Sequence, residues 1–262
     1  MSWEYDDSEP LVTPLQISEY QRGRAGVPAE EWELPPTLVA TFQRHAYARL
    51  VNQLDEASLD GDEDPAERLR VGALAQVPVV VTRLAIGAPA MAVELEPMIA
   101  RGVRNVLVVG SAGSLQPHLP IGSTVVVASA EREDGTSHHY LPAEVEVEAD
   151  AGLSDLLFTR ASVHGLRPER GRAWTIDAPY RETTGAIRRH RAAGVLVVEM
   201  EAAAIFAIAR VRGIRAGLVV AISDELFNVK YQPGFDDPRY RAALETNADA
   251  VMDTARALGP VS

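Results

Sequence analysis

The sequence predicts an α/β protein folded as one domain, and two observations carry this prediction. First, residues 195 to 224 read as strand, helix and strand: the apolar run Val195 to Val198, the helix-forming run Ala202 to Arg212, and the apolar run Ala216 to Ile222. Apolar β-branched runs of this kind are typical of strands that are buried on both faces. Second, strands and helices alternate from Thr37 to Leu258 without a linker, which favours a single α/β domain.

The bulk composition excludes several classes of function. Apolar residues make up 47% and charged residues 24% of the 262 residues, and the net charge is −12 with a pI near 5.0. An acidic chain is a poor partner for nucleic acids or an anionic membrane surface. The absence of cysteine excludes disulfides and thiolate metal sites. No apolar run has the length of a signal core near the N-terminus or of a membrane span, so we expect a soluble, cytoplasmic protein.

The N-terminal residues differ in character from the rest. Residues 1 to 36 are polar and punctuated by prolines, so we expect an extended N-terminal arm there and a single domain over residues 37 to 262. Thr37 to Thr41 reads as the first strand, and a helix follows from about Gln43 to Leu54. The acidic stretch from Asp55 to Arg68 favours an exposed loop.

The remaining elements follow in order. Apolar runs predict strands at residues 78–84, 105–109 and 123–130, and a helix is expected over residues 90–100. The last helix is expected from about Pro238 to Leu258, because Tyr240, Leu244, Ala248, Val251, Ala255 and Leu258 fall on one face. Gly213 is placed to end the helix that begins at Ala202.

Acidic side chains follow two of the apolar runs directly. Glu199 and Glu201 come after the strand 195–198, and Ser223-Asp224 comes after the strand 216–222. Ligand sites of open α/β sheets lie at the carboxyl ends of strands. The same residues suit structural roles as well, because glutamates favour the first turn of a helix and Ser-Asp is an ordinary turn or N-cap. The pattern alone leaves a ligand site and a structural role open.

Two stretches carry a resemblance to a known family. The run VEMEAAAIF, followed by a strand that ends in SD, resembles the nucleoside phosphorylase family that includes hexameric purine nucleoside phosphorylase, uridine phosphorylase and methylthioadenosine nucleosidase. The run GSAGSLQPH from Gly110 resembles the same family's loop GTxGAIQPH. The resemblance covers roughly residues 76 to 258. It implies a three-layer αβα phosphorylase-like fold with a central mixed β-sheet, assembled as a homo-oligomer (a dimer or a trimer of dimers).

The resemblance also implies roles for the acidic residues. In the family, the second Glu of EME holds the ribose hydroxyls, the Met packs on the sugar, and the Asp of SD acts on N7 of a purine. Here these residues are Glu201, Met200 and Asp224. A buried carboxylate can accept hydrogen bonds from two neighbouring hydroxyls, and a buried Asp with a raised pKa can act as an acid near neutral pH.

Further residues are expected around the base and the ribose. The segment from Trp174 to Thr183 corresponds to the family's base pocket, where Trp174 and Tyr180 could stack on a base or simply belong to the core. The resemblance completes the base site with Val198, Glu199 and Ser223. It places Ser111 and His139 near the ribose, although a loop histidine can equally be structural or exposed. The positions that read uracil in uridine phosphorylases are Thr183 and Gly185 here, so a purine is favoured.

Phosphate is the expected co-substrate, but the family's phosphate arginines are missing. Gly110 to Gly113 and the Ser111 hydroxyl could converge on an anion. The two arginine positions fall around Gln43-Arg44 and at Val108. Arg83 and Arg44 are therefore the candidate phosphate ligands of this chain, and Arg68 or Arg70 of the partner subunit could add a charge.

The implied activity is that of a pentosyltransferase: phosphorolysis of the N-glycosidic bond of a purine nucleoside, with no metal or organic cofactor. Two alternatives stay open. A hydrolytic nucleosidase would use water and would not need the missing arginines. A nucleoside-binding protein would keep Glu201 and the base pocket without turnover.

Overall fold

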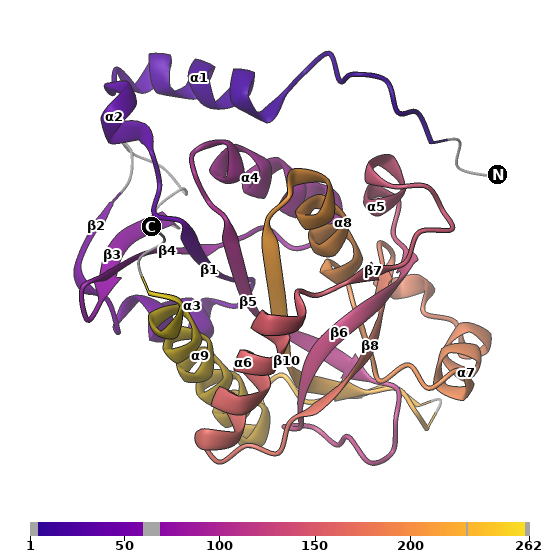
Figure 1. The fold of residues 1–262 in the computed structure, drawn as a ribbon. Coiled ribbons are helices and arrows are strands. Elements are labelled where there is room, and N and C mark those ends of the chain that lie inside the picture. Colours follow the sequence, from indigo (N-terminus) through magenta and orange to yellow (C-terminus); the bar gives the residue numbers. More distant parts are fainter. Residues whose placement is uncertain (1–4, 60–68, 229, 260–262) are drawn as a thin grey trace.

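A mixed β-sheet runs through the centre of the molecule, with helices on both sides (Figure 1). The computed structural model describes residues 5–59, 69–228 and 230–259. The strands are β1 (Thr37–Thr41), β2 (Asp55–Leu59), β3 (Leu69–Leu74), β4 (Val77–Arg83), β5 (Asn105–Ser114), β6 (Thr124–Glu133), β7 (Val147–Glu148), β8 (Glu169–Ile176), β9 (Val197–Glu199), β10 (Arg215–Glu225) and β11 (Gln232–Pro233). The helices are α1 (Pro14–Ala25), α2 (Ala29–Trp32), α3 (Arg44–Val51), α4 (Ala88–Ala100), α5 (Thr136–Tyr140), α6 (Ala151–Val163), α7 (Thr184–Ala192), α8 (Ala202–Arg212) and α9 (Pro238–Leu258), with a 3₁₀ turn at Pro179–Arg181.

Part of the sheet closes on itself. β5 pairs with β10, β10 with β6, β6 with β8, β8 with β9, and β9 with β5 again. β1, β4, β3 and β2 continue the sheet outward from β5. Parallel and antiparallel pairs both occur, so the sheet is mixed as predicted. The ring brings the ends of β5, β9 and β10 together although they are distant in the sequence.

The helices form two outer layers. Leu38 and Ala40 of β1 face the apolar cluster that contains α4 and α8, whereas Val39 faces the cluster that contains α3, α6 and α9. Because successive side chains of a strand point to opposite faces, a strand between two helical layers must be apolar throughout. The predicted three-layer αβα architecture is confirmed.

The central helix and the last helix follow their predicted patterns. Residues 202–209 of α8 are all buried, and Gly213 ends the helix with φ 63° in the left-handed region. The predicted apolar face of α9 packs onto the sheet, and the helix has the predicted bounds. None of the helices in the described ranges could cross a membrane.

Three sequence-based expectations for local structure were wrong. The N-terminal arm is not extended throughout, because α1 begins at Pro14 and packs on α4. Proline is compatible with the first helical turn, and Thr13 and Gln16 form a capping box. The expected acidic loop contains β2, which pairs with β3; its remainder, residues 60–68, lies outside the described residues. Finally, β5 continues to Ser114 instead of ending at Val109, because it stays paired with β10.

Candidate active site

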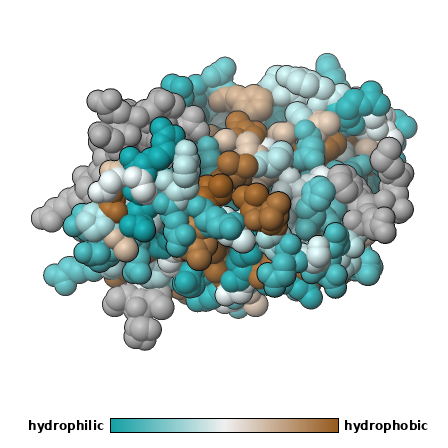
Figure 2. All heavy atoms as spheres, turned by 90° about the horizontal axis from the view of Figure 1, so that it is seen from above, coloured by the Kyte–Doolittle hydropathy of each residue, from teal (hydrophilic) through white to brown (hydrophobic). Residues whose placement is uncertain are grey.

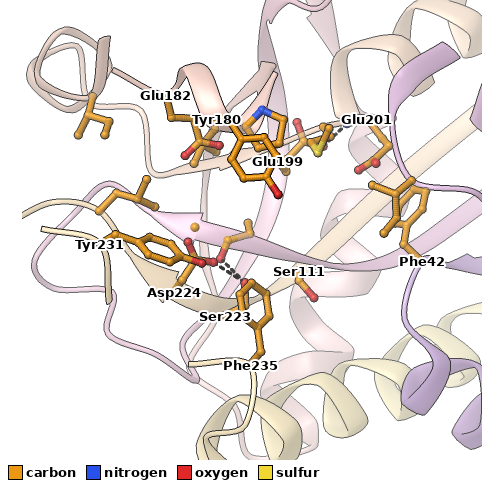
Figure 3. A pocket seen from close by; sticks show the side chains of 18 of the residues that line it. Phe42, Ser111, Tyr180, Glu182, Glu199, Glu201, Ser223, Asp224, Tyr231 and Phe235 are labelled. Atoms are coloured by element: carbon orange, nitrogen blue, oxygen red, sulfur yellow. Dashed lines mark hydrogen bonds between the residues drawn. The ribbon is translucent and has the colours of Figure 1, made fainter. Parts of the chain in front are cut away.

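A cavity of about 650 Å³ opens where β1, β5, β9 and β10 end (Figure 3). One end holds Glu201, Phe42 and Ser111, and the other holds Asp224, Tyr231 and Glu182. The sequence-predicted residues that line it are Ser111, Tyr180, Val198, Glu199, Met200, Glu201, Ser223 and Asp224. The fold therefore brings both acidic strand ends into one cavity.

The carboxylate of Glu199 is hydrogen-bonded to groups of the protein itself. It accepts hydrogen bonds from the backbone N–H groups of Glu201 (2.7 Å) and Ala202 (2.6 Å), and from the Thr175 hydroxyl. These N–H groups belong to the start of α8, where a helix leaves donors unsatisfied and favours a negative charge. Glu199 therefore has the structural role that the pattern allowed. It lines the cavity, but its strongest contacts are internal.

The carboxyl group of Glu201, in contrast, makes fewer hydrogen bonds within the protein. Its Oε1 accepts a hydrogen bond of 2.6 Å from the backbone N–H of Gly87, and its side chain lines the cavity. Gly87 precedes α4 with φ 96°, a backbone conformation that favours glycine. Only 6% of Glu201 is exposed. The loop before α4 thus fixes one oxygen of Glu201 while the carboxyl group remains at the cavity wall.

A negative charge on one of the two glutamates disfavours a second negative charge on the other. Burial raises the pKa of Glu199, although its three hydrogen bonds oppose this. Burial and then the charge of Glu199 raise the pKa of Glu201. Since Glu199 accepts more hydrogen bonds from the helix start, we infer that the negative charge is favoured on Glu199 and the proton on Glu201.

Asp224 is directed into the cavity by an irregularity in β10. The register between β10 and β5 shifts between Ile222 and Asp224, which leaves Ser223 as an extra residue on β10. Such a bulge re-aims the side chains beside it. The Ser223 hydroxyl donates to Asp224 Oδ1 (2.7 Å), and burial raises the pKa of Asp224. Gly113 lies opposite, where a Cβ atom would come within 3.0 Å of the carboxylate and 2.4 Å of Leu226.

The groups that were expected to bind phosphate, at Gly110 and Ser111, already make hydrogen bonds within the protein. The hydroxyls of Ser111 and Tyr240 lie 2.6 Å apart, and Phe42 and Gln43 line the cavity beside them. Gly110 and Ser111 are paired with Val220 and Ala221 of β10, so this stretch is strand and not the expected open loop. Gly110 does not line the cavity.

The candidate phosphate arginines do not line the cavity either. Arg44 is the first residue of α3 and is exposed, and Arg83 ends β4 beside Thr41. Of the suggested partner-subunit arginines, Arg68 lies outside the described residues. Within the described residues, Lys230 is the cation that lines the cavity, against Glu182, Glu199, Glu201 and Asp224. The ionisable groups of the cavity wall are therefore mainly acidic.

Two other predicted site residues do not line the described cavity. Trp174 is fully buried in the core and stacks on His190, with ring centroids 4.2 Å apart, so it cannot stack on a base. His139 is exposed on α5 and does not line the cavity. Tyr180, in contrast, is fully exposed at the cavity, where it can cover a ligand.

Several lining residues were missed from the sequence. Tyr231 and Phe235 lie on the segment between β10 and α9, to which the sequence assigned no site residue. Glu182 follows the 3₁₀ turn and lies within the segment assigned to the base pocket. Phe42 follows the first strand, where the family has a glycine-rich loop. Only Phe42 had a signal in the sequence, because it directly follows the predicted strand 37–41.

Most of the chain matches a known protein family. Residues 38–258 match the profile of the family described as Phosphorylase superfamily. This chain belongs to the phosphorylase superfamily. The resemblance to nucleoside phosphorylases is thereby confirmed, and this is a family of enzymes.

Relatives within the superfamily act on different nucleosides. Uridine phosphorylase of Haemophilus influenzae is 27% identical over 195 residues, which cover 69% of this chain and 76% of that protein. Guanosine phosphorylase of Halorubrum lacusprofundi is 33% identical over 141 residues, covering 54% of this chain and 58% of that protein.

Solved structures support the fold. Purine nucleoside phosphorylase from Toxoplasma gondii, in complex with immucillin-H, superposes with a TM-score of 0.78 at 17% identity, covering 87% of this chain and 93% of that one. Uridine phosphorylase from Vibrio fischeri gives a TM-score of 0.77 at 21% identity, covering 87% and 94%.

Proposed function

We propose that this protein cleaves the N-glycosidic bond of a purine nucleoside. The observation that carries the proposal is the placement of Glu201 and Asp224 at opposite ends of one cavity. Glu201 accepts hydrogen bonds from the ribose 2′- and 3′-hydroxyls and faces the positive charge that develops on the sugar. Asp224 donates a proton or a hydrogen bond to N7 as the base departs.

A purine suits the base end better than a pyrimidine. The raised pKa of Asp224 favours a carboxylic acid that can donate, and a purine offers N7 as the acceptor. Tyr180 and Tyr231 provide aromatic surface for the base. Relatives include both a guanosine and several uridine phosphorylases, so the choice of base rests on this chain's own residues.

The family reaction is phosphorolysis, and we propose it as the leading reaction, with phosphate near Ser111. Hydrolysis by water is the second candidate, because acidic groups line the cavity and its described lining contains no arginine. Burying a phosphate dianion demands several donors or cations. A water nucleophile makes no such demand.

The test is release of the base from inosine, guanosine, adenosine and uridine, with and without phosphate. Cleavage of purine nucleosides that produces ribose 1-phosphate supports phosphorolysis, and free ribose supports hydrolysis. Binding without release of any base would leave only a nucleoside-binding protein. Faster cleavage of uridine than of any purine nucleoside would contradict the assignment of the base.

Assembly is a further part of the proposal. The arm and α1 carry the exposed apolar residues Leu11, Val12, Leu15 and Tyr20, and Val93 of the neighbouring α4 is 75% exposed. Figure 2 shows apolar side chains gathered in the middle of this face. We propose that a second copy of the chain covers it.

A further inference from the structure

The hydroxyl of Ser111 is held by a residue of α9 that the proposed reaction does not use. Ser111 Oγ lies 2.6 Å from the hydroxyl oxygen of Tyr240, which belongs to the first turn of α9. In Figure 3 the Ser111 hydroxyl points toward the pale yellow ribbon of α9 and away from Glu201. The serine that the sequence assigned to phosphate and ribose is therefore turned toward the protein.

Packing fixes the position of Tyr240. Only 6% of the residue is exposed, and its ring makes an edge-to-face contact with Phe235, with the ring centroids 6.4 Å apart. The start of α9 is capped by Asp237, whose carboxylate accepts a hydrogen bond of 2.8 Å from the backbone N–H of Arg239. The cap and the ring contact together leave the phenol little freedom, so its hydroxyl is a fixed partner for Ser111.

The Tyr240 hydroxyl needs an acceptor for its proton. Burial raises the pKa of Tyr240, and the charge of Asp224 adds to this although the bond with Ser111 opposes it, so the phenol keeps its proton near neutral pH. Within the described residues, Ser111 is the one hydrogen-bond partner of this hydroxyl. Turning Ser111 toward an anion beside Glu201 would leave the phenol proton buried without an acceptor, which is unfavourable.

This cost falls on phosphate more than on water. Phosphate is a dianion near neutral pH, and its burial demands several donors or cations. The backbone groups of Gly110 and Ser111 are already paired with β10, and Lys230 is the cation of the described lining, so the loss of one hydroxyl donor weighs heavily. Water is neutral and supplies its own donors, so it makes no such demand.

Both nucleophiles complete the same exchange of bonds at C1′ of the ribose. The C1′–N bond breaks, its electron pair leaves with the base, and the base takes up a proton from Asp224. Water bonds to C1′ through its oxygen and releases a proton, which gives ribose, whereas phosphate bonds through one of its oxygens and gives ribose 1-phosphate. The ratio of these two sugars therefore reports which nucleophile reached C1′.

We propose that Tyr240 is a positioning residue that determines which nucleophile is used, because it holds the Ser111 hydroxyl toward α9 and so keeps it from phosphate. The inference rests on the proposed cleavage of the N-glycosidic bond. Phosphate recruits the Ser111 hydroxyl only by breaking the bond with Tyr240, and water reaches C1′ without breaking it.

The experiment compares wild-type protein with Tyr240→Phe, which keeps the ring and its contact with Phe235 and removes the hydroxyl. A neutral hydrogen bond corresponds to about a 2- to 10-fold effect. With inosine as substrate, we expect the ratio of ribose 1-phosphate to ribose at a fixed phosphate concentration to rise by that factor in the variant. The phosphate concentration at half-saturation should fall by the same factor. In a Ser111→Ala background, Tyr240→Phe should change neither value, since the effect acts through the Ser111 hydroxyl.

Tyr140→Phe is the matched control. Tyr140 also donates a hydrogen bond from its hydroxyl, 2.8 Å to Glu96, but it does not line the cavity. This variant should leave the product ratio and the half-saturation unchanged. The same two values unchanged in Tyr240→Phe would overturn the inference. A fall in the ratio would overturn it too, because Tyr240 would then help Ser111 to donate to phosphate.

Phosphate binding separates this inference from the proposed reaction. The dissociation constant of inorganic phosphate, measured by phosphorus NMR titration, should be lower in Tyr240→Phe than in wild type even if neither protein cleaves a nucleoside. Tighter phosphate binding without cleavage would overturn only the proposed function, whereas equal dissociation constants would overturn the inference about Tyr240. Tyr240→Leu, which also lacks the hydroxyl, gives the same test if the Phe variant fails to fold.

Discussion

The carboxylate of Glu199 accepts a hydrogen bond of 2.7 Å from the backbone N–H of Glu201, so the two acids of the motif are directly connected. Glu199 also binds the next N–H of α8, whereas the side chain of Glu201 meets the N–H of Gly87. The start of the helix therefore stabilises the charge on Glu199, and that charge disfavours a second one on Glu201. This asymmetry has a direct consequence for the pH dependence of catalysis.

We expect kcat/KM to rise with pH as Glu201 loses its proton. Its pKa is raised above the ordinary value of 4.5, so below the raised pKa the neutral acid cannot accept hydrogen bonds from both ribose hydroxyls. Glu201→Gln mimics the neutral form and should lower kcat/KM by roughly a hundredfold at pH 8, a loss typical of a strong transition-state contact. The difference from wild type should shrink as the pH falls. The measurement is a pH–rate profile on a riboside with an activated leaving group, which needs no proton from Asp224.

Glu199→Gln provides the companion measurement. An amide can still accept the backbone N–H groups with its oxygen and donate to Thr175, but it removes the neighbouring charge. The rising limb of the profile should therefore move to lower pH. A rising limb that does not shift in Glu199→Gln would contradict the effect of the Glu199 charge on the pKa of Glu201. Full activity in Glu201→Gln, with its fold intact, would contradict the role of Glu201 in binding the ribose hydroxyls.

Asp224→Asn should discriminate between leaving groups. If Asp224 protonates N7, its loss should slow cleavage of inosine and guanosine by about 10²–10⁴-fold, the usual range for a general acid. A riboside with an activated leaving group should be affected far less. The ratio of the two kcat/KM values is the quantity to measure, because equal losses would indicate a structural role for Asp224.

The same substitution predicts a gain in stability at high pH. Burial raises the pKa of Asp224 in the folded protein above the ordinary value of 3.8. The folded state then binds more protons than the unfolded state between these values, so the free energy of unfolding falls as the pH rises through that window. Asn removes this loss and retains an acceptor for the Ser223 hydroxyl. The Tm of Asp224→Asn should exceed that of wild type at pH 8, by about 2–4 °C for each kcal/mol, and the gain should shrink toward pH 4.

Thermal unfolding of Ser223→Ala serves as the comparison. That variant removes the hydrogen bond to Asp224 but keeps the buried acid, so it should show no stabilisation at pH 8. A Tm of Asp224→Asn that stays below wild type at every pH would mean that the carboxylate is stabilising in the fold.

Local signals explain what the sequence could and could not predict. Glu201 and Asp224 were predictable because each directly follows an apolar strand, and the ends of such strands meet in space. The structure of the expected phosphate loop was not predictable, because β5 continues to Ser114 only through its pairing with β10. That partner is distant in the sequence: Gly110 pairs with Val220. Trp174 illustrates another limit: an aromatic side chain on a strand faces the ligand or the core according to the sheet around it. Glu182 and Tyr231 lie on turns whose direction only the fold defines.

The face formed by α1 and α4 leads to a prediction about assembly. Val93 on α4 and Val163 on α6 are exposed to similar extents, 75% and 70%, but of these two helices only α4 packs on α1. Val93→Asp should therefore shift the protein toward a smaller species in analytical ultracentrifugation, because a charge is unfavourable in a buried apolar interface. Val163→Asp should leave the sedimentation unchanged. Identical sedimentation of Val93→Asp and wild type would place the interface elsewhere.

The nucleophile gives the last prediction, because the cavity differs most from its family there. Phosphate near Ser111 would meet a hydroxyl already bonded to Tyr240, backbone groups already paired in the sheet, and a wall whose ionisable groups are mainly acidic. We therefore expect half-saturation by phosphate well above the usual KM range of about 1 μM–1 mM, or hydrolysis that does not depend on phosphate.

The measurement is base release across a phosphate titration, with ribose 1-phosphate and free ribose both quantified. Ser111→Ala should raise the phosphate concentration at half-saturation if phosphate is used, and should leave hydrolysis by water unaffected. Gln43→Arg adds a cation to the cavity lining and should lower that concentration, since a positive charge favours a dianion. Saturation of wild type at micromolar phosphate, with ribose 1-phosphate as the sole product, would contradict the prediction and would mean that a cation outside the described lining completes the site. In that case Arg83→Ala is the decisive variant, because Arg83 ends β4 at the same edge of the sheet as Thr41 and Phe42.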